Sequence, residues 1–300
     1  MAVCAAPASS AASELEVGSS RLHVTLDGEP FRIGAAALVA WVRRSATIVA
    51  SYYGSFPVAD LTVHITAVDG GKVRNGRAEA GAGPAGHPSI QVRVGQAVPE
   101  SELLSDWVLV HEMTHLALPE VGREHAWLSE GLATYIEGVA RVQAGNMTPD
   151  ELWLEDVRSM PKGLPGDGDE GLDRTHTWAR TYWGGALFCL VADVTIRERT
   201  ANRLGLQDAM RAVARDSGGM QASWPIERVL HAGDAATGTT VLTELYAQMS
   251  SRPSAPDLAD LWRRLGIATD GDAVRLLAGT KEAATRESIT RPPAPRLLPQ

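Results

Sequence analysis

The chain has 300 residues, enough for one large domain or two smaller ones, and its composition is 44% apolar and 21% charged. This balance is that of a globular protein and excludes an intrinsically disordered chain. The formal net charge of −8, without any basic run, argues against nucleic acid or an anionic membrane surface as a partner.

The cysteine count and the lack of long apolar runs exclude two further classes of protein, those that depend on cysteine cross-links or cysteine metal sites and those with a transmembrane helix. Only two cysteines occur, Cys4 and Cys189, so neither a disulfide framework nor a cysteine-based zinc site can be built. No apolar run approaches the length of a transmembrane helix, so we expect no membrane span.

The first residues, MAVCAAPASSAASELEV, are small and uncharged up to Glu14. They are similar to the end of a secretory signal peptide, with Ser10-Ala11-Ala12 as a cleavage site, although a charged start and a full apolar core are missing. A disordered Ala/Ser leader is the alternative. We assign residues 1–13 to a leader or signal-peptide remnant, and favour a periplasmic or secreted protein over a cytoplasmic one.

The first third of the chain predicts a small twisted sheet with one packed helix. Residues 14–27 alternate apolar and polar side chains around a Gly-Ser-Ser turn, which indicates a hairpin. Apolar positions recur at helical spacing over 35–53, and residues 60–68 and 89–95 alternate as strands. The Gly-rich segment 70–88 is expected to be a connection.

After Pro99 the pattern becomes helical, interrupted by an acidic, Gly-rich loop at 161–173. Helices are expected over 101–118, 127–144, 148–159, 177–199, 205–216, 224–231, 238–250 and 256–264. The fold class is therefore α+β: an N-terminal α+β lobe over 14–118, a helical lobe over 119–280 and a tail over 281–300. A cleft between two such lobes is a natural place for a site.

The segment HEMTH, residues 111–115, places two histidines four residues apart with a glutamate beside the first. On a helix this pattern presents two zinc ligands and a general base, Glu112. A single helix over 101–118 would put His111 and His115 on one apolar stripe with Leu104 and Trp107. Two core histidines bonded to backbone carbonyls are the alternative. Burying both imidazoles beside a carboxylate without strong partners is costly, and a zinc ion would remove that cost.

A catalytic zinc needs a third protein ligand, and Glu130 in WLSEGLATYIEG is the candidate, with Ser129 before it as a helix cap. Small residues after Glu130, beginning with Gly131, permit a close approach of two helices. Glu137 lies seven residues further on the same face. It is expected to accept the free N–H of a ligand histidine, the alternative being a solvated carboxylate.

HEMTH followed by HAWLSEGLATYIEG resembles the gluzincin zinc metallopeptidases, in particular peptidase MA-like and glycyl-aminopeptidase-type catalytic domains. In that family a second helix delivers the third zinc ligand within a W-L-x-E-G-x-A-x-Y motif, and the likeness spans about residues 90–215. It implies a zincin-like fold with the zinc cleft between the two lobes, and one zinc ion per chain on His111, His115 and Glu130, with Glu112 as general base. It also implies Tyr182 as the hydroxyl donor to the oxyanion.

The expected function is therefore a zinc-dependent peptidase acting on peptides or proteins, with endopeptidase and aminopeptidase activity both open. Two alternatives stand beside it: a zinc hydrolase of a non-peptide bond, and a non-catalytic zinc-bearing binding protein on the same fold. Asp193, on the same helical face as Tyr182, either braces the site or pairs with an arginine. The strand 89–95 is expected to be a sheet edge that binds extended substrate by main-chain hydrogen bonds. The sequence does not indicate an oligomeric state.

Overall fold

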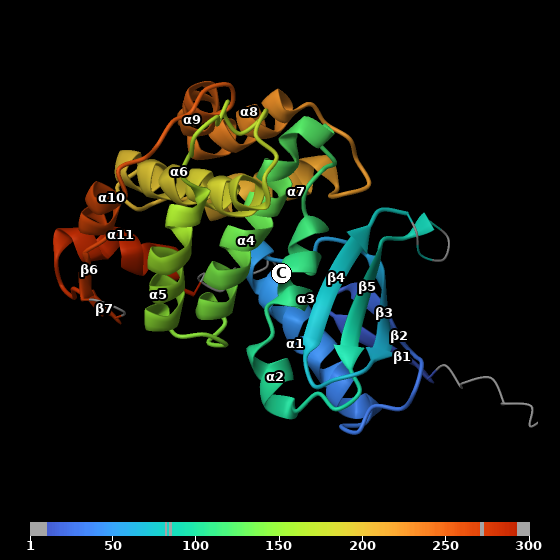
Figure 1. Ribbon diagram of the computed structural model, residues 1–300. Coiled ribbons are helices and arrows are strands. Elements are labelled where there is room, and N and C mark those ends of the chain that lie inside the picture. Colours follow the sequence, from blue (N-terminus) through green and yellow to red (C-terminus); the bar gives the residue numbers. More distant parts are fainter. Residues whose placement is uncertain (1–10, 82, 84–85, 271–272, 293–300) are drawn as a thin grey trace, which may run out of the picture.

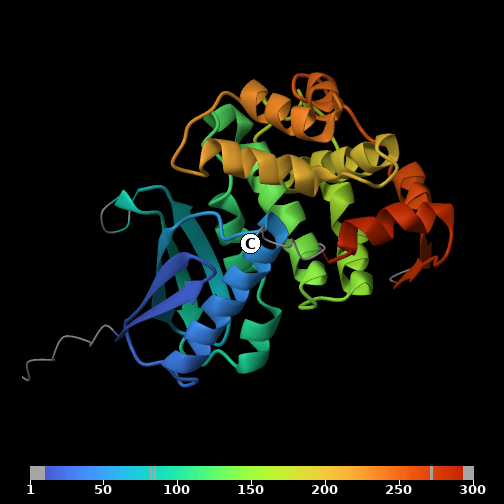
Figure 2. The same ribbon diagram turned by 180° about the vertical axis from the view of Figure 1, so that it is seen from behind.

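The computed structural model describes residues 11–292, except 82, 84, 85, 271 and 272. The predicted signal peptide falls largely on residues 1–10, outside the described residues, and so does the Pro-rich end from residue 293. A sheet lies at one end of the molecule and a helical lobe at the other (Figures 1 and 2). The mixture of helices and a five-stranded sheet confirms the α+β fold class.

The sheet has the order β1-β2-β3-β5-β4. The predicted hairpin is confirmed, because β1 (Ala11–Val17) pairs antiparallel with β2 (Ser20–Asp27) around a turn in which Gly18 has a φ of 62°. The predicted strands β3 (Asp60–Val68) and β5 (Ser89–Gly95) follow in parallel. Their apolar residues are buried, as the alternation requires.

The Gly-rich segment 70–88 is not only a connection, because it contains a fifth strand, β4 (Val73–Glu79), antiparallel to β5. This strand ends the sheet, so β5 is an inner strand and the prediction of an edge at 89–95 was wrong. Its sequence, VRNGRAE, alternates poorly and carries a central glycine, which weakens the strand signal.

The helix α1 (Ala35–Tyr53) packs against β1 and β2 and buries Trp41, Tyr52 and the other apolar residues that the periodicity predicted. The HEMTH helix, α3 (Val108–His115), contacts α1, β4 and β5 on the sheet side and α4 (Ala126–Gln143) on the other. It therefore lies where the two lobes meet, which places its side chains beside the sheet edge.

The helix expected over 101–118 is two helices, α2 (Glu100–Ser105) and α3. Asp106 has extended backbone (ψ 135°) and accepts the N–H groups of Val108 and Leu109 at 3.2 and 3.1 Å, so it caps α3. The break turns residues on both sides of Asp106 away from the core: Leu104 is 46% exposed and Trp107 50% exposed. The predicted single apolar stripe was therefore wrong before residue 108.

The helical lobe is built around α4, which contacts α1, α3 and the helices that follow it. The expected helices from 148 to 264 are confirmed, with shifted ends: α5 (Pro149–Ser159), α6 (Gly185–Arg199), α7 (Leu206–Ser217), α8 (Ile226–Thr237), α9 (Val241–Met249) and α10 (Leu258–Arg264). A capping box between Thr148 and Glu151 fixes the start of α5. No helix of the described chain is both long and apolar enough to cross a membrane.

Two elements near the C-terminal end were not expected. A small hairpin, β6 (Ile267–Asp270) with β7 (Ala273–Leu276), follows α10. The segment 281–290, assigned to a tail, forms α11 (Lys281–Thr290), which packs on α4 and α6 and buries Ile289 completely. This part of the chain thus belongs to the helical lobe.

Candidate metal centre

Three of the predicted site residues meet at the junction of α3 and α4. His111 Nε2 lies 3.3 Å and His115 Nε2 3.6 Å from Glu130 Oε2. The ligand atoms of the three side chains all lie within 4.8 Å of one another, and within the described part of the chain they are the only such group of three or more. The i, i+4 spacing on α3 and the single carboxylate on α4 produce this cluster.

The cluster fits a zinc ion. Ligand atoms about 2.0–2.1 Å from a tetrahedral zinc are about 3.3 Å apart, and the two histidine–carboxylate distances of 3.3 and 3.6 Å lie close to that value. Two imidazoles and one carboxylate are also the donor set of catalytic zinc sites with an open fourth position. His111, His115 and Glu130 are therefore the residues that could hold the metal.

The Nδ1 nitrogens of the two histidines have different surroundings. His115 Nδ1 lies 3.0 Å from Ser129 Oγ, which leaves Nε2 for the cluster. His111 Nδ1 is buried without a hydrogen-bond partner among the described residues. The expected acceptor, Glu137, instead accepts from Arg141 at 3.3 Å on its own helix. Burial raises the pKa of Glu137 to about 8.

The charges of the cluster are coupled. Burial lowers the pKa of His111. Burial also opposes the charged form of His115, but the hydrogen bond and charge of Glu130 outweigh it and raise the pKa of this imidazole. Burial opposes the ionisation of Glu130 too, yet hydrogen bonds from both histidines hold its pKa well below the usual range. Glu130 is thus ionised at neutral pH, the form in which a carboxylate can bind a metal cation.

Glu112 points from α3 to the edge strand β4. The N–H of Ala78 donates to Glu112 Oε2 at 2.9 Å. A Cβ on Gly76 would lie 2.5 Å from Glu112 Cγ, so only glycine leaves room for this side chain. Burial raises the pKa of Glu112, with the charge of His115 and the Ala78 hydrogen bond opposing it. A carboxyl with a raised pKa, fixed beside the cluster, suits proton transfer near neutral pH.

Tyr182 lies on η4 (Arg180–Gly184), a π-helical turn before α6, and its ring stacks on that of His111 with centroids 6.1 Å apart. Burial, then the negative charge of Glu130, raises the pKa of Tyr182 to about 12, so its hydroxyl keeps its proton at neutral pH. The turn is anchored by Arg180, whose Nε lies 2.7 Å from Asp169 Oδ2 in a buried ion pair. π-helical turns are frequent at functional sites.

The cluster opens into a cleft of about 940 Å³. Its walls are β4, the cluster face of α3 and α4, and the segment between these helices. The lining residues are Asn75, Gly76, Arg77, Ala78, Glu79, Ala80, His111, Glu112, His115, Leu118, Pro119, Glu120, Val121, Gly122, Arg123, Ala126, Ser129, Glu130, Tyr182 and Met220.

Solved structures of zinc metallopeptidases resemble this chain. An aminopeptidase N family protein from Idiomarina loihiensis superposes with a TM-score of 0.65 at 14% sequence identity over 86% of this chain and 49% of its own. A mutant of a two-domain M1 zinc metallopeptidase bound to L-arginine gives 0.56 at 17% identity, over 84% and 54%. The M1 zinc metallopeptidase from Deinococcus radiodurans gives 0.53 at 17% identity, over 83% and 53%.

The chain shares the fold of these M1 zinc metallopeptidase structures. The chain spans about half the length of these relatives. No protein-family model matches the sequence, and no curated protein matches it either.

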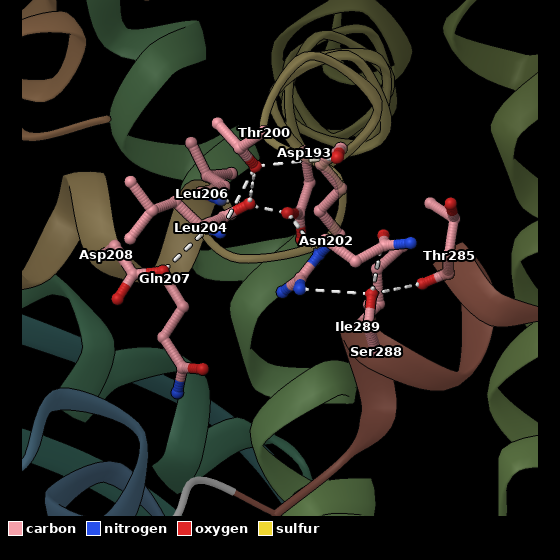
Figure 3. Close-up of polar contacts among 12 residues, drawn as sticks. Asp193, Thr200, Asn202, Leu204, Leu206, Gln207, Asp208, Thr285, Ser288 and Ile289 are labelled. Atoms are coloured by element: carbon pink, nitrogen blue, oxygen red, sulfur yellow. Dashed lines mark hydrogen bonds and ion pairs between the residues drawn. The ribbon is translucent and has the colours of Figure 1, made fainter. Parts of the chain in front are cut away.

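Within this fold, Asp193 lies in the helical lobe rather than in the cleft. It is buried and accepts from Tyr135 Oη at 2.8 Å, Arg197 Nε at 2.8 Å and the N–H of Leu206 at 2.9 Å. Figure 3 shows it beside the chain after α6, where further polar contacts reach Ser288 of α11. Of the two predicted roles, pairing with an arginine is the one observed.

The sequence did not predict the roles of several residues that shape the site. Gly76 and Ala78 belong to a strand whose signal was weak, and Ser129 was expected only as a helix cap. Gly131 was expected to bring α4 close to α3, but a Cβ there would meet Gly185 Cα at 2.4 Å. It therefore sets the approach of α6, directly after the turn that carries Tyr182.

Proposed function

We propose that this protein is a zinc-dependent peptidase. The observation that carries the proposal is the combination in one cleft of a three-residue ligand cluster with Glu112, which β4 holds at the wall of the same cleft. A purely structural zinc site is closed by four protein ligands and needs no carboxylate beside it. The fold shared with M1 zinc metallopeptidases supports the same conclusion.

Each residue has one role in the proposed reaction. His111, His115 and Glu130 would hold the zinc ion, which supplies Lewis acidity for activating water and polarising a carbonyl. Glu112 accepts the proton of the attacking water and passes it to the leaving amine. Tyr182, protonated at neutral pH, donates to the oxyanion that develops on the carbonyl oxygen.

The edge strand β4 is the proposed binding surface for the peptide main chain. It ends the sheet and lines the cleft, so its outer main-chain groups can pair with an extended peptide. Glu112 uses one of these groups, the N–H of Ala78. A mutant of the Deinococcus radiodurans relative was solved with a Tyr-Ser-Ala substrate, which supports short peptides as substrates of this chain also.

The test is a mixed peptide library incubated with zinc-loaded protein and analysed by mass spectrometry, with Glu112→Gln as the matched control. New termini made only by the parent protein support a peptidase, provided that elemental analysis finds equal zinc in both proteins. Loss of single N-terminal residues indicates an aminopeptidase, and internal cuts an endopeptidase. Cleavage of small esters but of no peptide would replace the proposal with a non-peptide hydrolase. If neither peptides nor small esters are hydrolysed, the result favours a non-catalytic zinc-bearing binding protein.

A further inference from the structure

Two tryptophans beside the metal cluster are turned toward solvent. Trp178 is 62% exposed and Trp107 50% exposed, and with Leu104 they are the exposed large hydrophobic residues of the described chain. Exposed apolar residues scattered singly need no explanation. These two are distinguished because each contacts a ring of the candidate site.

The four rings form a continuous row. Trp107 lies edge-on to His111 with centroids 5.7 Å apart, and His111 stacks on Tyr182 at 6.1 Å. Trp178 continues the row by stacking on Tyr182 at 5.6 Å, with an angle of 25° between the planes. The row therefore passes through the ligand and the hydroxyl donor and ends in half-exposed indoles on both sides.

Neither indole is needed to fill the core. Trp107 is turned outward by the break at Asp106, and Trp178 precedes the π-helical turn. The charged side chains of the cleft, such as Arg77, Glu79 and Arg123, come instead from β4 and the segment before α4. Apolar residues such as Leu118 and Met220 also line the cleft. Neither tryptophan is a lining residue, so the aromatic surface lies beside the cleft, where Trp178 stacks on Tyr182.

We propose that Trp178 forms an aromatic subsite that binds a large apolar or aromatic side chain of a peptide, at a residue flanking the bond to be cleaved. The inference rests on the proposed function, which puts the scissile carbonyl at Tyr182. The Cα atom that carries a side chain lies about 1.5 Å from its own carbonyl carbon, so the side chain of a residue at this bond reaches the indole stacked on Tyr182. Offset or edge-on contact with this indole then selects for aromatic rings.

The test measures binding separately from turnover. Isothermal titration calorimetry on zinc-loaded Glu112→Gln compares the peptides Ala-Ala-Phe-Ala-Ala and Ala-Ala-Ala-Ala-Ala. We expect the phenylalanine peptide to bind more tightly, and Trp178→Ala in the same background to weaken it about tenfold with little change for the alanine peptide. Trp107→Ala, at the opposite end of the row, should change the preference much less, and Trp178→Phe should keep most of it.

Leu104→Ala is the matched control, because Leu104 is similarly exposed and makes no ring contact with the site. Equal affinity of the two peptides for the parent, or equal weakening of both by Trp178→Ala, would overturn the subsite. The two proposals fail separately. Aromatic preference in binding without any peptide cleavage by the active protein contradicts the peptidase alone. Cleavage without such a preference, in the library or in calorimetry, contradicts the subsite alone.

Discussion

The substitution Gly76→Ala should lower activity while leaving the stability of the fold nearly unchanged. The new methyl group would lie 2.5 Å from Glu112 Cγ and 3.0 Å from its Cδ and Oε1. Carbon atoms in ordinary contact are about 3.5–4.0 Å apart, so Glu112 or β4 has to move by about 1 Å. That movement also strains the hydrogen bond from Ala78. Because a catalytic group misplaced by about 1 Å can cost roughly 100-fold, we expect kcat/KM to fall by about 10- to 100-fold.

The same substitution should have little effect on folding. Gly76 does not have a positive φ, so alanine meets no backbone penalty, and loss of glycine contributes about 0.4–1 kcal/mol through the unfolded chain. This gain partly offsets the steric cost at the strand edge. Thermal unfolding should therefore shift by only a few degrees, and the zinc content should stay at the parent level.

The assay is steady-state hydrolysis of a peptide identified from the library, with zinc measured on the same samples. Gly166→Ala is the matched control, because a Cβ at Gly166 would meet nothing within 4 Å. If Gly76→Ala keeps kcat/KM within about twofold of the parent, the contact between β4 and Glu112 does not position the base, and the reasoning fails.

Three further predictions concern residues away from β4. Tyr182→Phe should lower kcat by about 100- to 1,000-fold with little change in KM, because the lost hydrogen bond forms mainly in the transition state; unchanged kcat in steady-state assays would move this role elsewhere. Asp169→Asn should destabilise the protein by roughly 3–5 kcal/mol in urea unfolding, since it leaves the buried Arg180 without its carboxylate; a change under 1 kcal/mol would mean that water reaches the pair. Burial raises the pKa of Glu137 in the folded protein to about 8, above its ordinary value of 4.5. The free energy of unfolding should therefore fall as the pH rises from about 4.5 to 8, by an amount on the order of a few kcal/mol. Glu137→Gln should flatten that part of the pH–stability curve, and an unchanged slope would contradict the shift.

The parts of the structure that follow from local pattern were predicted well. The hairpin at 14–27 and the helix at 35–53 depend on alternation and helical spacing within a few residues. The meeting of His111, His115 and Glu130 was also predicted. Two of these side chains lie one turn apart on a helix, and the third follows on the next helix after a short loop.

The parts that depend on contacts across the fold were missed. Asp106 looks like a solvated residue inside a helical pattern, and its capping of α3 is visible only in three dimensions. Glu137 has the right spacing from Glu130, and its i, i+4 pair with Arg141 is a local pattern that the sequence contains. That Glu137 does not bond His111 Nδ1 depends instead on how α3 and α4 pack. The strand β4 is recognisable only from its pairing with β5, because its own residues favour a turn.

The position of β4 also has a consequence for solubility. A strand with an unpaired edge can accept an extended segment from another copy of the protein as readily as a peptide, which is a known route to aggregation. Gly76 lowers the strand propensity of β4, and the charges of Arg77 and Glu79 disfavour self-pairing. Residues on this strand are therefore under two constraints at once. Changes that improve its pairing with a peptide would also increase the tendency of the protein to associate with itself.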